Sequence, residues 1–339
     1  MERKKIRNIL KSIHAKDNIL VTSHLNPDGD SVCSELALGY FLEKIGKRYE
    51  ILNQGEIPSR YLFLDKDRKI KCATGGSNDL FSLDFKPNLT IVLECSHLER
   101  AGWVKKVVPE DSPIINLDHH PDNTFYGEIN YVDPCASSTG EIIYEILKIA
   151  KFPLDSIIST LFYVAILTDT GRFRFSNTTS RCLKICAELL KPGVDPQFIT
   201  HQIYFNHSPN SLKLLGETLR NLELFSREVC FLTINQKMLT DFEMKSPDTE
   251  GFVDYSLFLY GVKIGALFME APGGITKVSL RSQNTVDVGF LAKSFGGGGH
   301  KNAAGFSAKE SVPVLKEKVL QTILQILGEK EVKKEEVKV

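Results

Sequence analysis

The chain has 339 residues, of which 42% are hydrophobic, and its 42 lysines and arginines balance 42 aspartates and glutamates. This length exceeds what one hydrophobic core usually supports, so we expect two domains. A net charge of zero argues against a protein that grips long duplex DNA, because such proteins usually carry a basic excess that neutralises phosphates.

The cysteines and the N-terminal segment indicate the compartment. The seven cysteines are odd in number and form no CxxC pair, so neither a disulfide framework nor a structural zinc site is expected. Residues 1–18 are charged and amphipathic and lack the apolar stretch of a signal peptide. No run of 18 apolar residues occurs, which predicts that no segment spans a membrane. These features predict a cytoplasmic protein.

The first half of the chain alternates short apolar runs with helical patterns. Strands are predicted over 18–23, 89–94 and 113–118, and helices over 31–44, 138–149 and 156–168. Strands that alternate with helices are typical of an α/β fold with a doubly wound parallel sheet.

The second half changes character after a mostly helical segment over 179–226, whose middle part we interpret as the connection between domains. Strands are predicted over 229–234, 262–269 and 276–281, with a hairpin turn at Gly273–Gly274 and a glycine-rich loop ahead of a further helix. This pattern predicts a smaller mixed α/β domain. The predicted organisation is a first domain over 1–190, a helical linker over 191–215, a second domain over 216–328 and a charged, solvated tail over 329–339.

Four segments place metal-ligand side chains directly after a predicted strand or helix. They contain His24, Asp28 and Asp30; Glu94; Asp118, His119 and His120; and Asp169. The carboxyl ends of strands in an open α/β sheet line one crevice, so the three segments that follow strands can meet there. Carboxylates with imidazoles suit manganese or zinc-like ions better than calcium. Several carboxylates without cysteine favour a two-metal site of the kind that clamps a phosphoryl group.

Each motif alone has a simpler interpretation. The Asp-Gly-Asp sequence usually marks a turn and a helix cap. A His-His pair is more often structural than a ligand, and Asp169 alone is compatible with a solvated helix end. Four independent segments that all supply ligand side chains favour the metal site over these simpler interpretations.

The motifs also resemble a known family. HLNPDGDS (24–31), DHH (118–120) and TDTGRF (168–173), in this order, resemble the DHH phosphoesterases, and GGGGHKNAAG (296–305) resembles the DHH-associated C-terminal domain of type one. The resemblance covers roughly residues 15–310, and the layout is most similar to the bacterial nanoRNase/pAp phosphatase branch. That branch degrades short oligoribonucleotides and removes the 3′-phosphate of 3′-phosphoadenosine 5′-phosphate (pAp).

The resemblance implies two divalent ions, with Mn²⁺ expected and Mg²⁺ as the alternative. One ion would be bound by His24, Asp28 and Glu94, and the other by Asp30, Glu94, His119 and Asp169. His120 would lie near the substrate phosphate. Asp118 would not bind a metal itself but would orient the ligand histidines. The family usually has Asp where this chain has Glu94. The extra methylene adds roughly 1.5 Å of reach against a tolerance of about 0.2 Å, so either the backbone retreats or one ion binds more weakly.

The second domain is expected to bind the substrate. Four consecutive glycines let the backbone pass close to a ligand, and N–H groups at a following helix start can hold phosphate. Substrate-binding roles are predicted for Gly297, Gly298, Gly299, His300, Arg281, Arg100 and Arg172. A glycine run alone usually marks a flexible loop, and Arg281 alone is compatible with a solvated strand residue. The resemblance favours binding, with Arg281 forking onto a phosphate.

The sequence therefore predicts a two-metal phosphoesterase of short oligoribonucleotides, pAp or both. A phosphodiesterase of cyclic or linear dinucleotides shares the core and stays open as an alternative. A nucleotide-binding module with weakened catalysis is compatible with Glu94. An inorganic pyrophosphatase shares the first motifs but is disfavoured by the glycine-rich signature. The predicted partner is short RNA or a small nucleotide, with neither a membrane nor long duplex DNA, and the oligomeric state is open to a homodimer.

Overall fold

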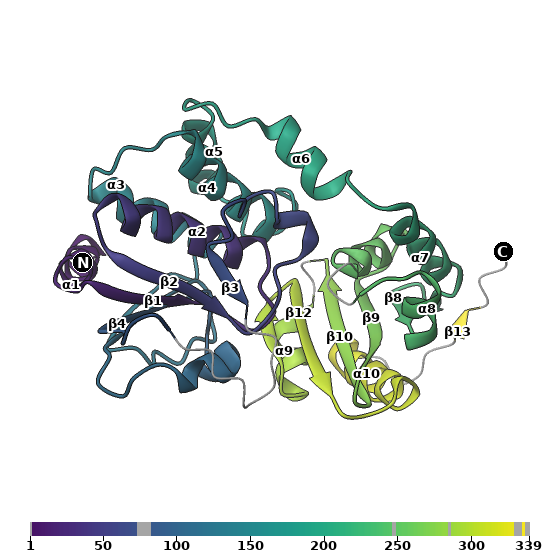
Figure 1. Ribbon diagram of the computed structural model, residues 1–339. Coiled ribbons are helices and arrows are strands. Elements are labelled where there is room, and N and C mark those ends of the chain that lie inside the picture. Colours follow the sequence, from purple (N-terminus) through teal and green to yellow (C-terminus); the bar gives the residue numbers. More distant parts are fainter. Residues whose placement is uncertain (1, 73–82, 246–248, 284–285, 329–333, 336–339) are drawn as a thin grey trace. The chain divides into compact units, whose positions relative to one another are not determined.

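The computed structural model describes residues 2–72, 83–245, 249–283, 286–328 and 334–335. The chain forms two units, Met1–Asn206 and His207–Val339, which we call unit 1 and unit 2 (Figure 1). Their division falls inside the segment that the sequence analysis assigned to the linker. The predicted domain boundaries themselves stay predictions.

A six-stranded parallel sheet forms the centre of unit 1 (Figure 1). Its strands are β1 (Asn18–Thr22), β2 (Arg48–Asn53), β3 (Ile70–Cys72), β4 (Leu89–Leu93), β5 (Ile114–Asp118) and β6 (Ile129–Val132). The spatial order is β3-β2-β1-β4-β5-β6, and each pair in this series is parallel. The order reverses between β1 and β4, which is the arrangement of a doubly wound fold. The predicted α/β fold is confirmed.

Helices lie in more than one layer on one side of this sheet, and a 3₁₀ helix packs on the other side. The helices are α1 (Glu2–His14), α2 (Gly29–Lys44), α3 (Thr139–Ile149), α4 (Ser156–Asp169), α5 (Ser180–Leu189) and α6 (Pro196–Tyr204), with 3₁₀ helices η1 (Ser59–Tyr61) and η2 (Leu98–Lys106). Ile19 and Val21 of β1 pack in the core with the helices, whereas Leu20 packs against Val104 of η2. β1 is buried on both faces because successive strand side chains alternate.

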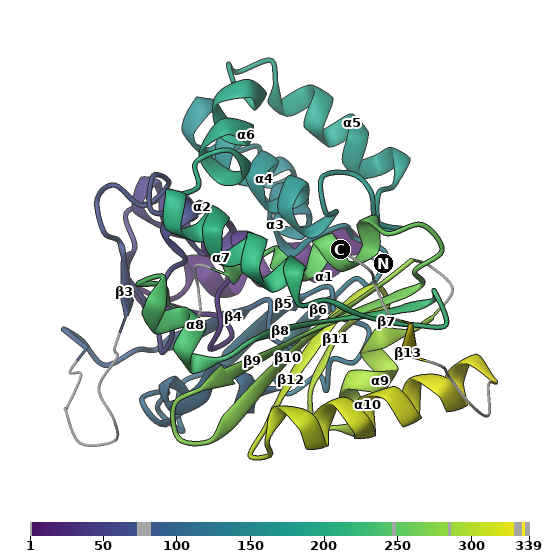
Figure 2. The same cartoon turned by 90° about the vertical axis from the view of Figure 1, so that its right-hand side faces the viewer.

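Unit 2 is built on a mixed sheet with the order β11-β12-β10-β9-β8-β7-β13. Its strands are β7 (Glu223–Phe225), β8 (Val229–Ile234), β9 (Ile264–Ala271), β10 (Ile275–Ser282), β11 (Gly298–His300), β12 (Ala303–Ala308) and β13 (Lys334–Glu335). Figure 2 shows α9 (Val288–Ser294) and α10 (Val312–Leu327) on one face and α7 (Pro209–Arg220) and α8 (Gln236–Asp241) on the other. A 3₁₀ helix, η4 (Phe252–Phe258), packs with the second group. The predicted mixed second domain is confirmed.

Two local expectations in unit 2 need correction. The glycine-rich loop leads into the β11–β12 hairpin and not into a helix start. The glycines allow the hairpin strands to approach closely, because a Cβ at Gly297 would lie 2.2 Å from the Gly305 carbonyl oxygen. In the expected tail, Lys334–Glu335 pair with β7, while 329–333 and 336–339 lie outside the described residues. The hairpin turn at Gly273–Gly274 is confirmed, with φ of 77° and 71°.

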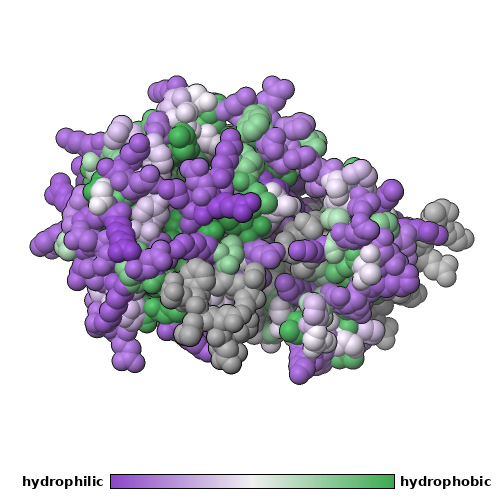
Figure 3. Space-filling model, in the orientation of Figure 1, coloured by the Kyte–Doolittle hydropathy of each residue, from purple (hydrophilic) through white to green (hydrophobic). Residues whose placement is uncertain are grey.

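The cysteines, the helices and the surface can be compared with what the composition predicts. All seven cysteines are free thiols. Within the described ranges, no helix combines the length and the apolar character that a bilayer span requires. Hydrophilic side chains cover most of the face drawn in Figure 3, as expected for a chain with 25% charged residues.

Candidate metal centre

The candidate ligands of unit 1 lie at the carboxyl edge of its sheet. His24 comes shortly after β1, Glu94 directly after β4, and His119 directly after β5. Asp169 is the last residue of α4. β1 and β4 are neighbours on either side of the reversal in strand order, and open α/β sheets usually bind ligands at the carboxyl ends of such a pair.

A first group consists of His24, Asp28 and Glu94, whose donor atoms all lie within 4.8 Å of one another. Asp28 uses its two oxygens differently. Oδ1 accepts a hydrogen bond from the Ser31 N–H at 3.0 Å and so caps α2, while Oδ2 lies 3.9 Å from Nε2 of His24. Burial, together with the charge of Arg100, lowers the pKa of His24 to about 4. The His24 ring is therefore neutral at neutral pH and able to bind a cation.

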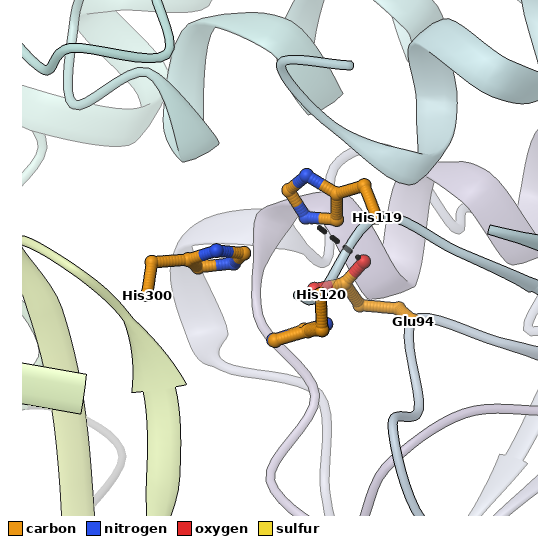
Figure 4. Close-up of side chains that lie close together, drawn as sticks. All are labelled: Glu94, His119, His120 and His300. Carbon is orange, nitrogen blue, oxygen red and sulfur yellow. Dashed lines mark ion pairs between the residues drawn. The ribbon is translucent and has the colours of Figure 1, made fainter. Parts of the chain in front are cut away.

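His119 is the centre of a second group. Its Nε2 lies 3.3 Å from Glu94 Oε2, 3.6 Å from Asp169 Oδ2 and 3.8 Å from Asp30 Oδ2 (Figure 4 draws the Glu94 contact). Its Nδ1 lies 3.2 Å from the Ala136 carbonyl oxygen, which only accepts, so we assign the proton of the neutral ring to Nδ1. A neutral ring then turns an electron pair toward three carboxylates. This arrangement requires a proton or a cation between them.

The pKa shifts of the second group have related causes. Burial and the Glu94 charge raise the pKa of Asp30 well above its ordinary value, and burial raises the pKa of Asp169 to about 7. Burial alone would lower the pKa of His119, but the Glu94 and Asp169 carboxylates raise it well above its ordinary value. These groups hold protons that a divalent ion would displace. A set of carboxylate oxygens and imidazole nitrogens fits such an ion.

Glu94 belongs to both groups and is 1% exposed. Its backbone has a φ of 52°, in the left-handed region that residues other than glycine rarely adopt. That conformation costs about 1–2 kcal/mol, so the surrounding contacts must hold it. Glu94 Oε2 accepts a hydrogen bond from Thr139 Oγ1 at 2.5 Å, and Oε1 lies 3.5 Å from Nδ1 of His120. The position suits the bridging role that the resemblance implies, which stays a prediction.

A segment that no sequence motif indicated orients several of these ligands: residues 133–140, which run from the end of β6 into the first turn of α3. The Thr139 and Gly140 N–H groups donate to the two oxygens of Asp30, at 2.7 and 2.9 Å. The same loop supplies Thr139 Oγ1 to Glu94 and the Ala136 carbonyl to His119. We call this segment the ligand-support loop. Its sequence signal is the Ser138–Glu141 capping pattern, which marks a helix start but not its contacts.

Asn177 extends this support to the fourth motif. Its amide donates to Asp169 Oδ2 at 3.0 Å and to the Ser137 carbonyl oxygen at 3.0 Å. Asn177 therefore ties Asp169 to the ligand-support loop. No local sequence pattern marks Asn177 as part of the site.

Asp118 and His120 lie beside the two groups. Asp118 Oδ1 accepts from the backbone N–H groups of His119 and His120 and lies 2.8 Å from Nδ1 of His120. Its Oδ2 accepts from Asn123 at 2.6 Å. Burial alone would raise the pKa of Asp118, but the His120 ring lowers it. Burial alone would lower the pKa of His120, but Glu94 and Asp118 raise it. Asp118 therefore holds a His120 ring that favours its protonated form.

The two arginines of unit 1 that were predicted to bind phosphate differ in their surroundings. Arg100 donates from Nη1 to Ser96 Oγ at 3.3 Å, and its charge contributes to the lowered pKa of His24. The exposed Arg172 lies over the ring of Tyr204 in α6, at 4.5 Å. The structure thus places Arg100 near the first group, and it places Arg172 against α6.

The predicted substrate residues of unit 2 lie on three neighbouring strands. Arg281 of β10 stands in register with Ala303 of β12, which stands in register with His300 of β11. Residues in one register row share a face, so Arg281 and His300 flank the small Ala303. Gly298 and Gly299 belong to β11, and Gly297 directly precedes it. Arg281 donates from Nε to Asp254 at 3.0 Å and from Nη1 to the Leu280 carbonyl at 3.0 Å.

Comparison with known proteins agrees with this architecture. Residues 18–166 match the DHH family, N-terminal domain, and residues 229–329 match the DHHA1 domain. The chain is 30% identical over 302 residues to the probable bifunctional oligoribonuclease and PAP phosphatase NrnA of Streptococcus mutans, covering 88% of this chain and 92% of the relative. It is 30% identical over 307 residues to the bifunctional oligoribonuclease and PAP phosphatase NrnA of Thermus thermophilus, covering 90% and 87%.

A solved structure supports the fold alone. The crystal structure of an exopolyphosphatase-related protein from Bacteroides fragilis superimposes with a TM-score of 0.83 at 24% identity, over 96% of both chains.

A doubly wound sheet with buried carboxylates and imidazoles at its strand-order reversal, joined to a DHHA1 domain, defines a metal-dependent phosphoesterase. The chain belongs to the DHH family, and it is a hydrolase that acts on phosphoester bonds. The resemblance drawn from its motifs is confirmed.

Proposed function

We propose that this chain hydrolyses short oligoribonucleotides and pAp with two divalent ions, Mn²⁺ being more effective than Mg²⁺. The observation that carries the proposal is the meeting of two ligand groups that share Glu94 at the reversal in strand order. The relatives from Streptococcus mutans and Thermus thermophilus are named as oligoribonucleases and PAP phosphatases, which supports these two substrates.

The ligand assignment follows the two groups. His24, Asp28 and Glu94 would hold one ion, and Asp30, Glu94, His119 and Asp169 would hold the other. Bound ions of this kind lower the pKa of water and offset the charge that develops on phosphoryl oxygens. Imidazole nitrogens favour Mn²⁺ over Mg²⁺, because Mg²⁺ prefers oxygen ligands and retains its water.

The protein's own residues handle protons and position the phosphate. His120 has a raised pKa and is held by Asp118, so its protonated ring can donate to a phosphoryl oxygen or to the leaving group. Arg100, near His24, adds a positive charge beside the first group. These roles need a substrate phosphate at the carboxyl edge of the unit 1 sheet.

Unit 2 would hold another part of the substrate. Asp254 and the Leu280 carbonyl fix two nitrogens of Arg281, and Nη2 makes no hydrogen bond within the described part of the chain. A guanidinium fixed in this way is a prepared donor for a phosphate oxygen. With His300 in the same register row, Arg281 supports a compact anionic subsite and not an extended groove.

The test is a turnover assay with Mn²⁺ on RNAs of about two to ten nucleotides, on pAp and on cyclic dinucleotides. We expect the highest kcat/KM for pAp and for RNAs up to about five nucleotides, because one compact site engages few nucleotides. Chelation should abolish turnover, and Mn²⁺ should restore it better than Mg²⁺. A preference for cyclic dinucleotides would replace the proposal with the phosphodiesterase alternative. Nucleotide binding without turnover would indicate a weakened site at Glu94.

A further inference from the structure

Three aromatic side chains are exposed within six residues of unit 2. Tyr255 and Phe258 of η4 are 36% and 62% exposed, and Tyr260, just beyond η4, is 102% exposed. Large aromatic side chains usually lie buried, since each can bury about 150–250 Å². Their exposure in one short segment therefore requires a reason other than core packing.

The rings of Tyr255 and Phe258 form a pair. Their centroids are 5.1 Å apart, with an angle of 42° between the ring planes. Side chains three residues apart eclipse one another in a 3₁₀ helix, which explains why these two rings meet. Tyr260 follows two residues later, directly before Gly261, whose φ of 86° turns the chain. The result is a small aromatic surface, which we call the η4 platform (Tyr255, Phe258 and Tyr260).

The backbone beneath the η4 platform is firmly anchored. Phe252 and Val253 are each 2% exposed and belong to the core on this face of the unit 2 sheet. Ser256 packs against Gly265 of β9, where a Cβ would lie 1.6 Å from the serine Oγ. Gln283 donates to the Leu257 carbonyl oxygen at 3.2 Å. The exposed rings therefore project from a fixed frame, which reduces the entropy lost when a ligand stacks on them.

The η4 platform lies on the same face of the unit 2 sheet as two basic side chains, Arg281 and His300, which we call the basic pair. Leu280 of β10 packs with α9 and α10, so the next residue, Arg281, faces the opposite side. On that side Asp254 of η4 bonds Arg281, and Asp254 directly precedes Tyr255. His300 shares the register row of Arg281 through Ala303. η4, which carries two of the aromatic rings, and the side chains of Arg281 and His300 thus lie on one face of the sheet.

These features favour a nucleobase over a protein as the occupant. A stable protein interface buries about 800 Å² on each partner, more than the exposed parts of these three side chains provide. A base stacked on an aromatic side chain gains about 1–3 kcal/mol without sequence preference. Arg281, fixed by the Asp254 carboxylate of η4, still offers the N–H groups of Nη2 to the phosphate of the same nucleotide. A stacking surface beside a phosphate donor is the arrangement used to bind single-stranded RNA.

We propose that the η4 platform is a stacking subsite for the second nucleobase of a short RNA, next to a phosphate held by Arg281 and His300. The inference rests on the proposed oligoribonuclease function and deepens it. The subsite should affect the binding of RNA but not of pAp, because pAp has only one base and does not need it. The η4 platform then favours RNA of two or more nucleotides without selecting its sequence.

The test compares KM for a trinucleotide and for pAp in Phe258→Leu, Phe258→Trp and Tyr255→Ala/Phe258→Ala. The double variant should raise KM for the trinucleotide about tenfold, as expected for the loss of one stacked base, and leave KM for pAp within about twofold. Phe258→Leu keeps an apolar side chain but loses the π face, and it should also raise KM, whereas Phe258→Trp should preserve it. Phe290→Ala is the matched control, because Phe290 is 70% exposed on α9, across the sheet.

The outcomes separate this inference from the proposed function. Unchanged KM for the trinucleotide in the double variant overturns the subsite, and so does an equal rise for pAp. A change in oligomeric state with unchanged KM overturns it in favour of a protein contact. If the native enzyme hydrolyses neither substrate, the proposed function fails. Anisotropy with a fluorescent dinucleotide then decides the subsite by itself, since the double variant should weaken binding about tenfold and equal affinity overturns it.

Discussion

The parallel sheet of unit 1 and the mixed sheet of unit 2 present their polar side chains in different ways. In unit 1 the candidate ligands other than Asp169 follow the ends of β1, β4 and β5, so the chain direction of each strand brings them to one edge. In unit 2 the basic pair, Arg281 and His300, lies on the face of the sheet, in one register row. The first arrangement groups carboxylates so that they could hold a cation, whereas the second could present a surface to a larger ligand. The comparison predicts that substitutions in unit 1 act on kcat and metal binding and those in unit 2 act on KM.

The largest effect is expected for ligands of the second group. Asp30→Ala or His119→Ala should reduce kcat roughly 1000-fold or more, because a bound cation contributes several kcal/mol of charge stabilisation and each 1.4 kcal/mol is about tenfold. Turnover with Mn²⁺, metal content and a thermal melt measure this. Asp111→Asn is the control, since Asp111 is an exposed carboxylate paired with Lys86. Near-native turnover in either variant would contradict the assignment of Asp30 and His119 as metal ligands, and with it the contrast between the two units.

The ligand-support loop should produce the next largest effect. Thr139→Val keeps the shape of the side chain but removes the hydroxyl that donates to Glu94. Loss of such a supporting hydrogen bond should weaken Mn²⁺ binding about 10- to 100-fold, measured by calorimetric titration. Thr160→Val is the matched control, because the Thr160 hydroxyl bonds only within α4 in the described structure. Equal Mn²⁺ affinity in both variants would show that the loop does not orient the ligands.

Arg281→Ala tests whether unit 2 acts on substrate binding and not on metal binding. We expect KM for short RNA to rise about tenfold, as for the loss of a charged hydrogen bond, with Mn²⁺ affinity unchanged. Lys318→Ala on α10, across the sheet, should leave both quantities unchanged. Steady-state kinetics with a metal titration test this. A loss of Mn²⁺ affinity in Arg281→Ala, or an unchanged KM, would contradict the division of roles.

The smallest effect is a pH-dependent stability that unit 1 should show when stripped of metal. Burial raises the pKa of Asp169 from 3.8 to about 7. Because the folded-state value lies above the unfolded one, this contribution is complete below a pH of about 4 and is lost as the pH rises through 7. In EDTA, Asp169→Asn should therefore melt about 5 °C higher than the native protein above pH 7 and equally at pH 4.

His24 contributes to the pH dependence of stability in the opposite direction, but it contributes equally to the native protein and to Asp169→Asn. The difference in melting temperature between the two proteins therefore does not contain it. The lowered pKa of His24 gives stability that is present above pH 6.5 and is lost toward pH 4. A difference in melting temperature that does not change with pH would show that Asp169 is not the group responsible.

Much of the unit 1 site could be predicted from sequence because its signals are local. Asp28 lies where a turn meets a helix start, and Glu94 lies where an apolar run ends, so a short window contains both the element and its ligand. β2 escaped prediction because Glu50 interrupts its apolar pattern. That carboxylate is buried and forms an ion pair with Lys71 of β3, at 3.2 Å.

The contacts that could not be predicted join distant positions. Thr139 donates to Asp30 across 109 residues, and no local pattern encodes that pairing. The glycine-rich segment was interpreted as a phosphate-binding helix start, but its glycines serve the close approach of β11 and β12. The η4 platform was missed for a similar reason, because an aromatic-rich segment resembles core until burial shows otherwise.

The ligand-support loop has a consequence for how ions enter the site. Thr139 bonds Asp30 through its backbone and Glu94 through its hydroxyl, and Glu94 belongs to both ligand groups. A first ion that draws in Glu94 would therefore also set the position of Thr139 and, through it, of Asp30. Occupation of one position prepares the other, so filling should be cooperative. The enzyme would then change from empty to doubly occupied over a narrow range of metal concentration, and a singly loaded form would be scarce.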